Sequence, residues 1–113
     1  MKKIYVAGPY RAETVAGIDY NITMARRLAI EVWKLGAAAF CPHLNSGFMD
    51  GVVPDKNFLD GDMDFLRICD GMIVVPGYEK SKGTLAEIKL ADSLKIPVFM
   101  DLYVLREWLE GSK

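Results

Sequence analysis

The sequence predicts an α/β domain of three layers, with a parallel sheet of four to five strands between two layers of helices. Four short apolar runs occur along the 113 residues, and a segment with helical apolar periodicity follows each run. Such alternation favours parallel strands that are joined by right-handed helical crossovers. The length corresponds to a single domain over residues 1–113, and a hydrophobic content of 51% supplies its core.

The predicted strands are the β-prone runs 3–7, 37–41, 72–75 and 95–100. The predicted helices cover 19–35, 58–69, 85–94 and 101–111, and each has one apolar face. Asp19 is the expected N-cap of the first helix, and Gly36 is the residue that ends it. Residues 42–51 are rich in turn formers and are expected to form a loop. Trp33, Phe65 and Ile68 are expected on buried helix faces. The whole pattern is that of a flavodoxin- or Rossmann-like sheet.

The overall charge and the apolar content limit the kinds of partner that we expect. The formal net charge is −1, so the chain has no bulk attraction for nucleic acid or for an anionic membrane. No run approaches the ~20 apolar residues of a membrane span, and the N-terminal run is too short for a signal peptide. We therefore expect a cytoplasmic protein. Cys41 and Cys69 lack metal-ligand spacing and are expected to be buried free thiols. The apolar excess in a short chain suggests a homo-oligomer, a dimer or a tetramer.

The sequence contains no cofactor motif. No Gly-x-Gly-x-x-Gly follows the first strand and no P-loop is present, which argues against NAD enzymes and NTPases. His43 is the only histidine, and no second histidine, cysteine pair or carboxylate cluster completes a metal site around it. Because His43 follows the second strand, it is a candidate substrate contact, although a loop histidine more often forms a local hydrogen bond. We expect no cofactor and no metal.

The segment 76–87 is the main candidate for a ligand site. It connects an apolar strand to a helix through a turn that contains Ser81, Gly83 and Thr84. Backbone N–H groups at such a helix N-terminus bind anions and the oxygens of a sugar or phosphate. Glu87 lies about one turn inside the helix, where it can face the same pocket. The alternative is an ordinary βα turn with a solvent-facing glutamate.

The loop after the first strand is expected at the same edge of the sheet. Gly8, Pro9, Tyr10 and Arg11 leave the carboxyl end of that strand, where ligands bind in open α/β sheets. Tyr10 and Arg11 are therefore candidate ligand contacts. In the alternative, Tyr10 packs under the loop and Arg11 is solvated.

Three elements of the sequence together resemble one known family. They are Gly8-Pro9-Tyr10 after the first strand, Asp62-Met63-Asp64-Phe65-Leu66 ahead of Cys69-Asp70, and Ser81-x-Gly83-x-x-x-Glu87 in the third βα turn. In this combination the chain resembles the nucleoside 2-deoxyribosyltransferase family over most of its length. That family includes the 2′-deoxynucleoside 5′-monophosphate N-hydrolases and many short bacterial and phage members.

The resemblance implies cleavage or exchange of the N-glycosidic bond of a nucleoside or nucleotide. Glu87 matches the family's nucleophile, which attacks C1′ of the deoxyribose, and Asp62 matches the acid that contacts the departing base. Tyr10 matches the tyrosine that helps to position the glutamate, and Ser81 matches the position that contacts the 5′ end of the sugar. The transferases have an acid at that position and the monophosphate hydrolases a serine, so the resemblance favours a nucleoside 5′-monophosphate.

The residue types also fit this chemistry by themselves. Cleavage through an oxocarbenium-like state needs a carboxylate beneath C1′ and a proton donor for the leaving base. Longer family members complete the pocket with a C-terminal extension and a neighbouring subunit, and the chain shows no obvious counterpart. If water reaches the intermediate freely, we expect hydrolysis to dominate over transfer, and the choice between the two reactions stays open. Two rival interpretations stay open. One is a non-catalytic nucleotide-binding or sensing module with the same pocket, and the other is a structural oligomer with a vestigial pocket.

Overall fold

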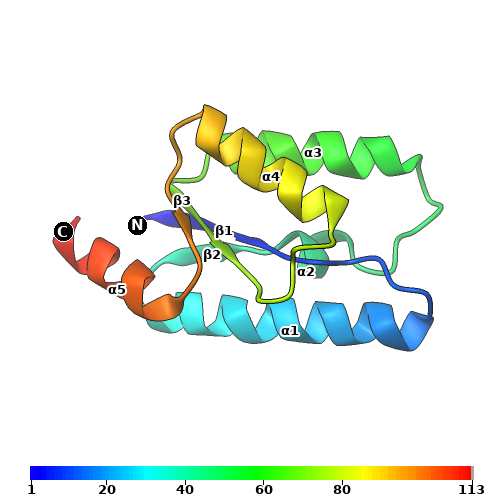
Figure 1. Cartoon of the computed structure of the whole chain (residues 1–113), viewed down its shortest axis with the longest axis horizontal. Coiled ribbons are helices and arrows are strands. Elements are labelled where there is room, and N and C mark those ends of the chain that lie inside the picture. The colour runs from blue at the N-terminus through cyan, green and yellow to red at the C-terminus, as the bar shows by residue number, and fades with distance from the viewer. Residues whose placement is uncertain (113) are drawn as a thin grey trace.

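A parallel sheet of four strands forms the middle layer of the molecule (Figure 1). The computed structural model describes residues 1–112, and its strands are β1 (Lys3–Ala7), β2 (Ala38–Phe40), β3 (Gly71–Val74) and β4 (Val98–Phe99). The helices are α1 (Val15–Lys34), α2 (Pro42–Ser46), α3 (Asp55–Arg67), α4 (Lys82–Ser93) and α5 (Leu102–Gly111). The strand order is β2-β1-β3-β4, with every pair parallel. The predicted three-layer class with a flavodoxin-like parallel sheet is confirmed.

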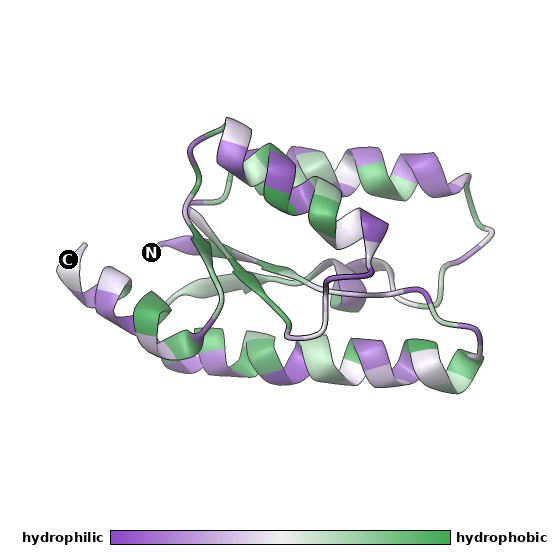
Figure 2. Cartoon of the chain, viewed as in Figure 1, coloured by the Kyte–Doolittle hydropathy of each residue, from purple (hydrophilic) through white to green (hydrophobic). Residues whose placement is uncertain are grey.

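Helices cover both faces of the sheet, and the side chains of β1 divide between the two faces. Helices α1 and α5 lie on one face, and α3 and α4 lie on the other (Figure 1). Ile4 and Val6 belong to the core under α1 and α5, whereas Tyr5 and Ala7 belong to the core under α3 and α4. A strand imposes this alternation on successive side chains. Figure 2 shows hydrophobic strands between helices that carry both hydrophobic and hydrophilic residues.

The register brings the carboxyl ends of the central strands level at one edge. Where β1 pairs with β3, Tyr5 lies opposite Met72 and Ala7 lies opposite Val74. Where β1 pairs with β2, Tyr5 lies opposite Phe40. The loops that follow these three strands therefore leave the sheet at the same edge, which is where ligands bind in open α/β folds.

Helix α1 begins at Val15, and its N-cap is Thr14 rather than the predicted Asp19. The hydroxyl oxygen of Thr14 accepts a hydrogen bond from the N–H of Gly17 at 3.0 Å. Val15 is 72% exposed, so the first turn adds little to the apolar stripe, and the periodicity of the sequence misses it. Gly36 has a φ of +86° and follows the helix as predicted.

Residues 42–46 form the short helix α2, where the sequence predicted a loop. Pro42 occupies the first turn of this helix, where its missing N–H leaves no hydrogen bond unmade and its fixed φ suits the helix. The residues of this segment are typical of loops, and for that reason the sequence pattern did not predict its single helical turn. Its consequence for the site is that His43 is held on a helix rather than on a loop.

Three large apolar side chains that were expected to be buried are exposed, namely Trp33, Phe65 and Ile68. The buried stripes are narrower than the sequence pattern suggests, because α1 buries Ile22, Ala25, Ala29 and Val32 and α3 buries Leu66. A sheet of four short strands covers only a narrow stripe of each helix. Among the helices that the structure describes, none combines the length and the apolar character needed to cross a membrane.

Candidate active site

A cavity of about 640 Å³ opens at the carboxyl ends of the central strands. Its walls are the loops that follow β1, α2 and β3, helix α2 itself, residues 55–62 of α3 and the N-terminal turns of α4. The volume is in the usual range of sites for small ligands. All the site residues predicted from the sequence line it: Gly8, Pro9, Tyr10, His43, Asp62, Ser81, Gly83, Thr84 and Glu87.

Glu87 lines the cavity from α4 and is 9% exposed. The hydroxyl of Tyr5, in the middle of β1, donates a hydrogen bond to Oε2 of Glu87. Burial raises the pKa of Glu87 to about 7, the hydrogen bond from Tyr5 opposes this rise, and the negative charge of Asp62 adds to it. A carboxyl group with a pKa near neutrality can exchange a proton at physiological pH.

Asp62 lines the same cavity from α3, the helix that packs beside α4. Burial raises the pKa of Asp62 to about 6. The charge of Asp62 contributes to the raised pKa of Glu87, so the two carboxyl groups lie close enough to interact. Two carboxyl groups with raised pKa values on neighbouring helices can divide the roles of proton donor and base or nucleophile.

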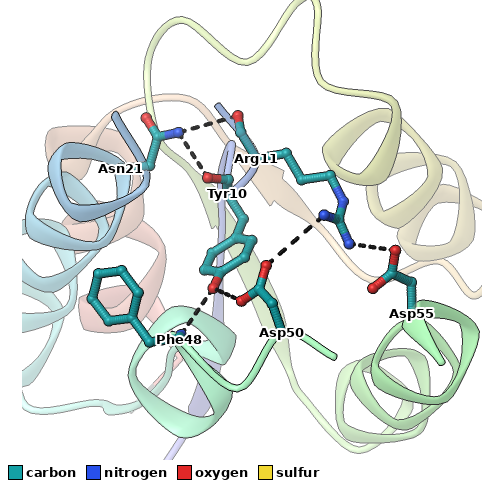
Figure 3. A network of polar contacts seen from close by, with 6 residues as sticks. All are labelled: Tyr10, Arg11, Asn21, Phe48, Asp50 and Asp55. Atoms are coloured by element: carbon teal, nitrogen blue, oxygen red, sulfur yellow. Dashed lines mark hydrogen bonds and ion pairs between the residues drawn. The ribbon is translucent and has the colours of Figure 1, made fainter. Parts of the chain in front are cut away.

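Tyr10 does not make the contact with Glu87 that was expected of it. Its hydroxyl donates to Oδ1 of Asp50 and accepts from the backbone N–H of Phe48 at 2.8 Å, so it holds the loop between α2 and α3 (Figure 3). The physical reason is position, because Tyr10 lies beyond the end of β1, whereas Tyr5 lies within the strand beneath α4. The contact with Glu87 belongs to Tyr5.

Tyr5 is the residue at this site that sequence reasoning missed. It is 0% exposed, and a buried tyrosine hydroxyl needs a hydrogen-bond partner. The signal in the sequence is a single tyrosine within the otherwise aliphatic run Ile4-Tyr5-Val6-Ala7. Burial, reinforced by the charge of Glu87, raises the pKa of Tyr5, so its hydroxyl remains protonated and remains a donor.

Ser81 is the N-cap of α4 and lies at the cavity wall. Its hydroxyl oxygen accepts hydrogen bonds from the backbone N–H of Thr84 at 3.2 Å and from the Thr84 hydroxyl at 2.9 Å. A hydroxyl oxygen has two acceptor lone pairs and one proton to donate. With both lone pairs engaged, Ser81 offers its proton to an acceptor in the cavity. Lys80 and Lys82 line the cavity on either side of it.

The loop after β1 is fixed by one close approach and one histidine. A Cβ on Gly8 would lie 2.7 Å from Cγ2 of Val75, so glycine allows the loop to pass against the end of β3. Nε2 of His43 lies 2.8 Å from the carbonyl oxygen of Pro9, which can only accept, so Nε2 carries the proton. Burial lowers the pKa of His43, which keeps the ring neutral. His43 thus makes the local hydrogen bond that was the alternative for it, while its ring lines the cavity.

The match to a family model decides where the chain belongs. A model described as a domain of unknown function, DUF7768, matches residues 2–101. The chain belongs to the DUF7768 family. A search of curated proteins gave no match to this DUF7768 protein. Within residues 1–112, no three His, Cys, Asp or Glu side chains gather in the manner of a metal site.

Solved structures share the fold of this DUF7768 protein. A conserved protein from Enterococcus faecalis V583 is 22% identical, with a TM-score of 0.69 over 87% of this chain and 61% of the other. A 2-desoxiribosyltransferase from Leishmania mexicana is 21% identical, with a TM-score of 0.63 over 88% and 63%. A 2-deoxyribosyltransferase from Bacillus psychrosaccharolyticus is 20% identical, with a TM-score of 0.61 over 85% and 69%.

These likenesses confirm a nucleoside 2-deoxyribosyltransferase-like fold for the DUF7768 protein, as the sequence resemblance predicted. The chain spans 61% to 69% of the lengths of these three proteins. At identities of 20% to 22%, what the chain shares with them is the arrangement of the backbone.

Proposed function

We propose that this DUF7768 protein cleaves or exchanges the N-glycosidic bond of a nucleoside or of its 5′-monophosphate, with Glu87 as the nucleophile. The observation that carries the proposal is the carboxyl pair. Glu87 and Asp62 line one cavity from neighbouring helices, and both have raised pKa values. Perturbed carboxyl groups in a cleft are typical of acid–base and covalent catalysis.

The first step breaks the bond between C1′ and the base. The ionised carboxylate of Glu87 attacks C1′, and the electron pair of the C1′–N bond moves to the base nitrogen, which takes the proton of Asp62. Because Tyr5 holds Oε2 of Glu87, Oε1 is the atom left to bond the sugar. The positive charge that develops in the oxocarbenium-like state is stabilised by the carboxylate beneath it.

The second step releases the sugar from Glu87. Asp62, now ionised, takes a proton from a water molecule, and the water oxygen bonds to C1′ as the ester to Glu87 breaks. If another base occupies the site in place of water, its nitrogen attacks C1′ and the result is exchange. Both outcomes use the same two carboxyl groups and return them to their starting protonation states.

The turn at Ser81 supports a phosphate at the 5′ end of the substrate. Its hydroxyl has a proton to donate. The first N–H groups of α4 and the positive end of the helix dipole also favour an anion at this turn. Lys80 and Lys82 line the cavity beside it and add positive charge. A donor of this kind suits the oxygens of a phosphate, which only accept hydrogen bonds when they are ionised. We therefore propose that the protein prefers a nucleoside 5′-monophosphate to the free nucleoside.

One observation supports the rival interpretation of a nucleotide-binding module without turnover. Burial raises the pKa of Glu87 to about 7 and that of Asp62 to about 6. The two carboxyl groups therefore compete for a proton near neutral pH, whereas a glutamate nucleophile needs that proton to lie on Asp62. Catalysis then proceeds through the fraction of molecules in which the proton lies on Asp62, and a small fraction gives a slow enzyme or a sensor.

The test is a panel of nucleosides and their 5′-monophosphates incubated with the purified protein. Free base is separated by chromatography, and binding of each compound is measured by calorimetry. Release of base from at least one 5′-monophosphate is the expected result. Binding without release supports the sensing module, and the absence of both binding and release refutes a nucleotide site.

A further inference from the structure

A polar network joins the loop after β1 to α1, to the loop before α3 and to α3 (Figure 3), and four of its residues, Tyr10, Arg11, Asp50 and Asp55, line the cavity. Arg11 extends from the loop after β1 to α3, where its Nη2 lies 2.6 Å from Oδ2 of Asp55. Its Nη1 lies 3.9 Å from Oδ2 of Asp50. The amide of Asn21, on α1, donates to the carbonyl oxygen of Tyr10 at 3.0 Å and to that of Arg11 at 3.5 Å. The backbone beneath the Arg11 side chain is therefore fixed, and its guanidinium forms a bridge between two walls.

The bridge ends on the face of α3 that also carries Asp62. Asp55, Phe58, Leu59 and Asp62 all line the cavity, and their spacing of three, four and seven residues places them on one face of the helix. Seven residues at the helical rise separate Asp55 from Asp62 by ~10 Å along the axis. Between them, Phe58 and Leu59 provide an apolar wall that suits the flat face of a base.

We propose that Arg11, held by Asp55, is a specificity-determining residue that limits the size of the base. This inference rests on the proposed function, in which the base leaves toward Asp62. A base that contacts Asp62 and lies along Phe58 directs its far edge to the Arg11–Asp55 bridge. Substituents on that edge meet the guanidinium, whereas an unsubstituted base stops short of it.

We call this limit on the size of the base, set by the Arg11–Asp55 bridge, the gate. The bridge can act as a gate because it contributes little to the stability of the fold. The side chains of Arg11 and Asp55 are 64% and 60% exposed, and an ion pair this exposed adds little to the stability of a fold. Removing the bridge therefore leaves the fold intact. The neighbouring loop has its own anchor, since the Tyr10 hydroxyl holds the N–H of Phe48, a residue with a φ of 62°. A change at Arg11 thus alters the cavity wall without releasing this loop.

The experiment compares two 5′-monophosphates that share a base, one of them with a bulky group on the exocyclic amine of that base. Their relative kcat/KM and relative Kd are measured for the wild type, Arg11→Ala, Asp55→Asn and the control Arg26→Ala, in which an exposed arginine on α1 is removed. We expect Arg11→Ala to raise the relative value for the bulky nucleotide by up to about 5-fold, because in the wild type the bulky group must break one exposed ion pair to displace the guanidinium. Asp55→Asn should shift the ratio in the same direction by a smaller factor, and Arg26→Ala should leave it unchanged.

The outcomes separate the gate from the proposed function. If the ratio in Arg11→Ala equals that of the wild type, the gate is wrong, whether or not base is released. If no variant releases base but the ratio of Kd values shifts as expected, the gate stands and the catalytic proposal fails. If neither nucleotide binds while another member of the nucleoside and nucleotide panel releases its base, the gate is overturned and the proposed function stands.

Discussion

The hydroxyl of Tyr5 donates a hydrogen bond to Oε2 of Glu87, and the two residues are 82 positions apart in the sequence. The contact joins the central strand to the helix that carries the proposed nucleophile. Tyr5 is fully buried and Glu87 is nearly so, so the hydrogen bond acts in a region of low dielectric constant, where it orients the carboxylate strongly.

The first prediction concerns the removal of that hydroxyl. Because the hydrogen bond lowers the pKa of Glu87, Tyr5→Phe should raise that pKa, and the loss of rate should be larger below pH 7, where more Glu87 is then protonated, than above pH 8. A hydrogen bond to a charged group contributes about 1.5–3 kcal/mol, so kcat should fall by about 10- to 100-fold. Tyr103→Phe, which removes an exposed hydroxyl on α5, is the matched control. The same loss of rate at every pH in Tyr5→Phe would show that the contact does not tune the pKa of Glu87.

The second prediction is a bell-shaped dependence of kcat/KM on pH, with its maximum between about 6 and 7. Below this range Glu87, with a pKa raised to about 7 by burial, is protonated and cannot attack. Above it Asp62, with a pKa raised to about 6, has lost the proton that the base needs. Asp62→Asn should remove the dependence on Asp62 and lower the rate by about 10²- to 10⁴-fold. A profile that is flat from pH 5 to pH 8 contradicts these roles.

The third prediction is that the proposed nucleophile destabilises the fold. The pKa of Glu87 rises from 4.5 to about 7 on folding, so the folded state binds its proton more tightly than the unfolded state does. The contribution of Glu87 to the free energy of unfolding is therefore most favourable below about pH 4.5, and it declines as the pH rises to about 7. At 1.36 kcal/mol per pKa unit, the decline is about 3 kcal/mol.

Glu87→Gln keeps the shape of the side chain and cannot ionise, so at pH 8 it should unfold at higher denaturant concentration than the wild type. Near pH 4.5 the two proteins should differ little. Glu107→Gln, at an exposed position on α5, provides the control. Equal stabilities of Glu87→Gln and wild type at pH 8 would count against the raised pKa.

The fourth prediction addresses the 5′ end of the substrate. Ser81→Asp keeps an oxygen that can cap α4 but replaces the hydroxyl donor by a negative charge. The variant should repel a 5′-phosphate and accept a hydrogen bond from a free 5′-hydroxyl. We expect the preference for the monophosphate over the nucleoside to fall by about 10-fold or more, because the carboxylate and the phosphate would repel each other. A monophosphate preference that survives Ser81→Asp places the phosphate elsewhere.

Local sequence patterns predicted the parts of this fold that depend on neighbours in the chain. The alternation of apolar runs with periodic segments gave the parallel sheet. The periodic segment 85–94 predicted α4, which in the structure begins three residues earlier, so Gly83 and Thr84 lie in its first turn and not in the preceding turn. The first N-cap was missed because Thr14 starts a turn whose first residue, Val15, is exposed. Helix α2 was missed because one turn that begins with proline has the composition of a loop.

At the candidate site, local sequence patterns predict which elements meet but not which side chains contact one another. That Glu87 and Asp62 line one cavity follows from the order of the elements, so the sequence could predict it. Which tyrosine reaches Glu87 depends on the direction of one side chain in β1, and both Tyr5 and Tyr10 were available. The bridge from Arg11 to Asp55 joins segments 44 residues apart, and no local pattern indicates it.

The most direct test of the central claim is turnover by Glu87→Ala, measured together with binding. On the substrate that the wild type processes fastest, Glu87→Ala should reduce base release by about 10⁴-fold or more, as the loss of a nucleophile does in other enzymes. Its Kd should stay within a few-fold of the wild-type value, and Glu79→Ala, at an exposed position outside the cavity, should retain full activity. Base release by Glu87→Ala at the wild-type rate would contradict the role of Glu87 as nucleophile.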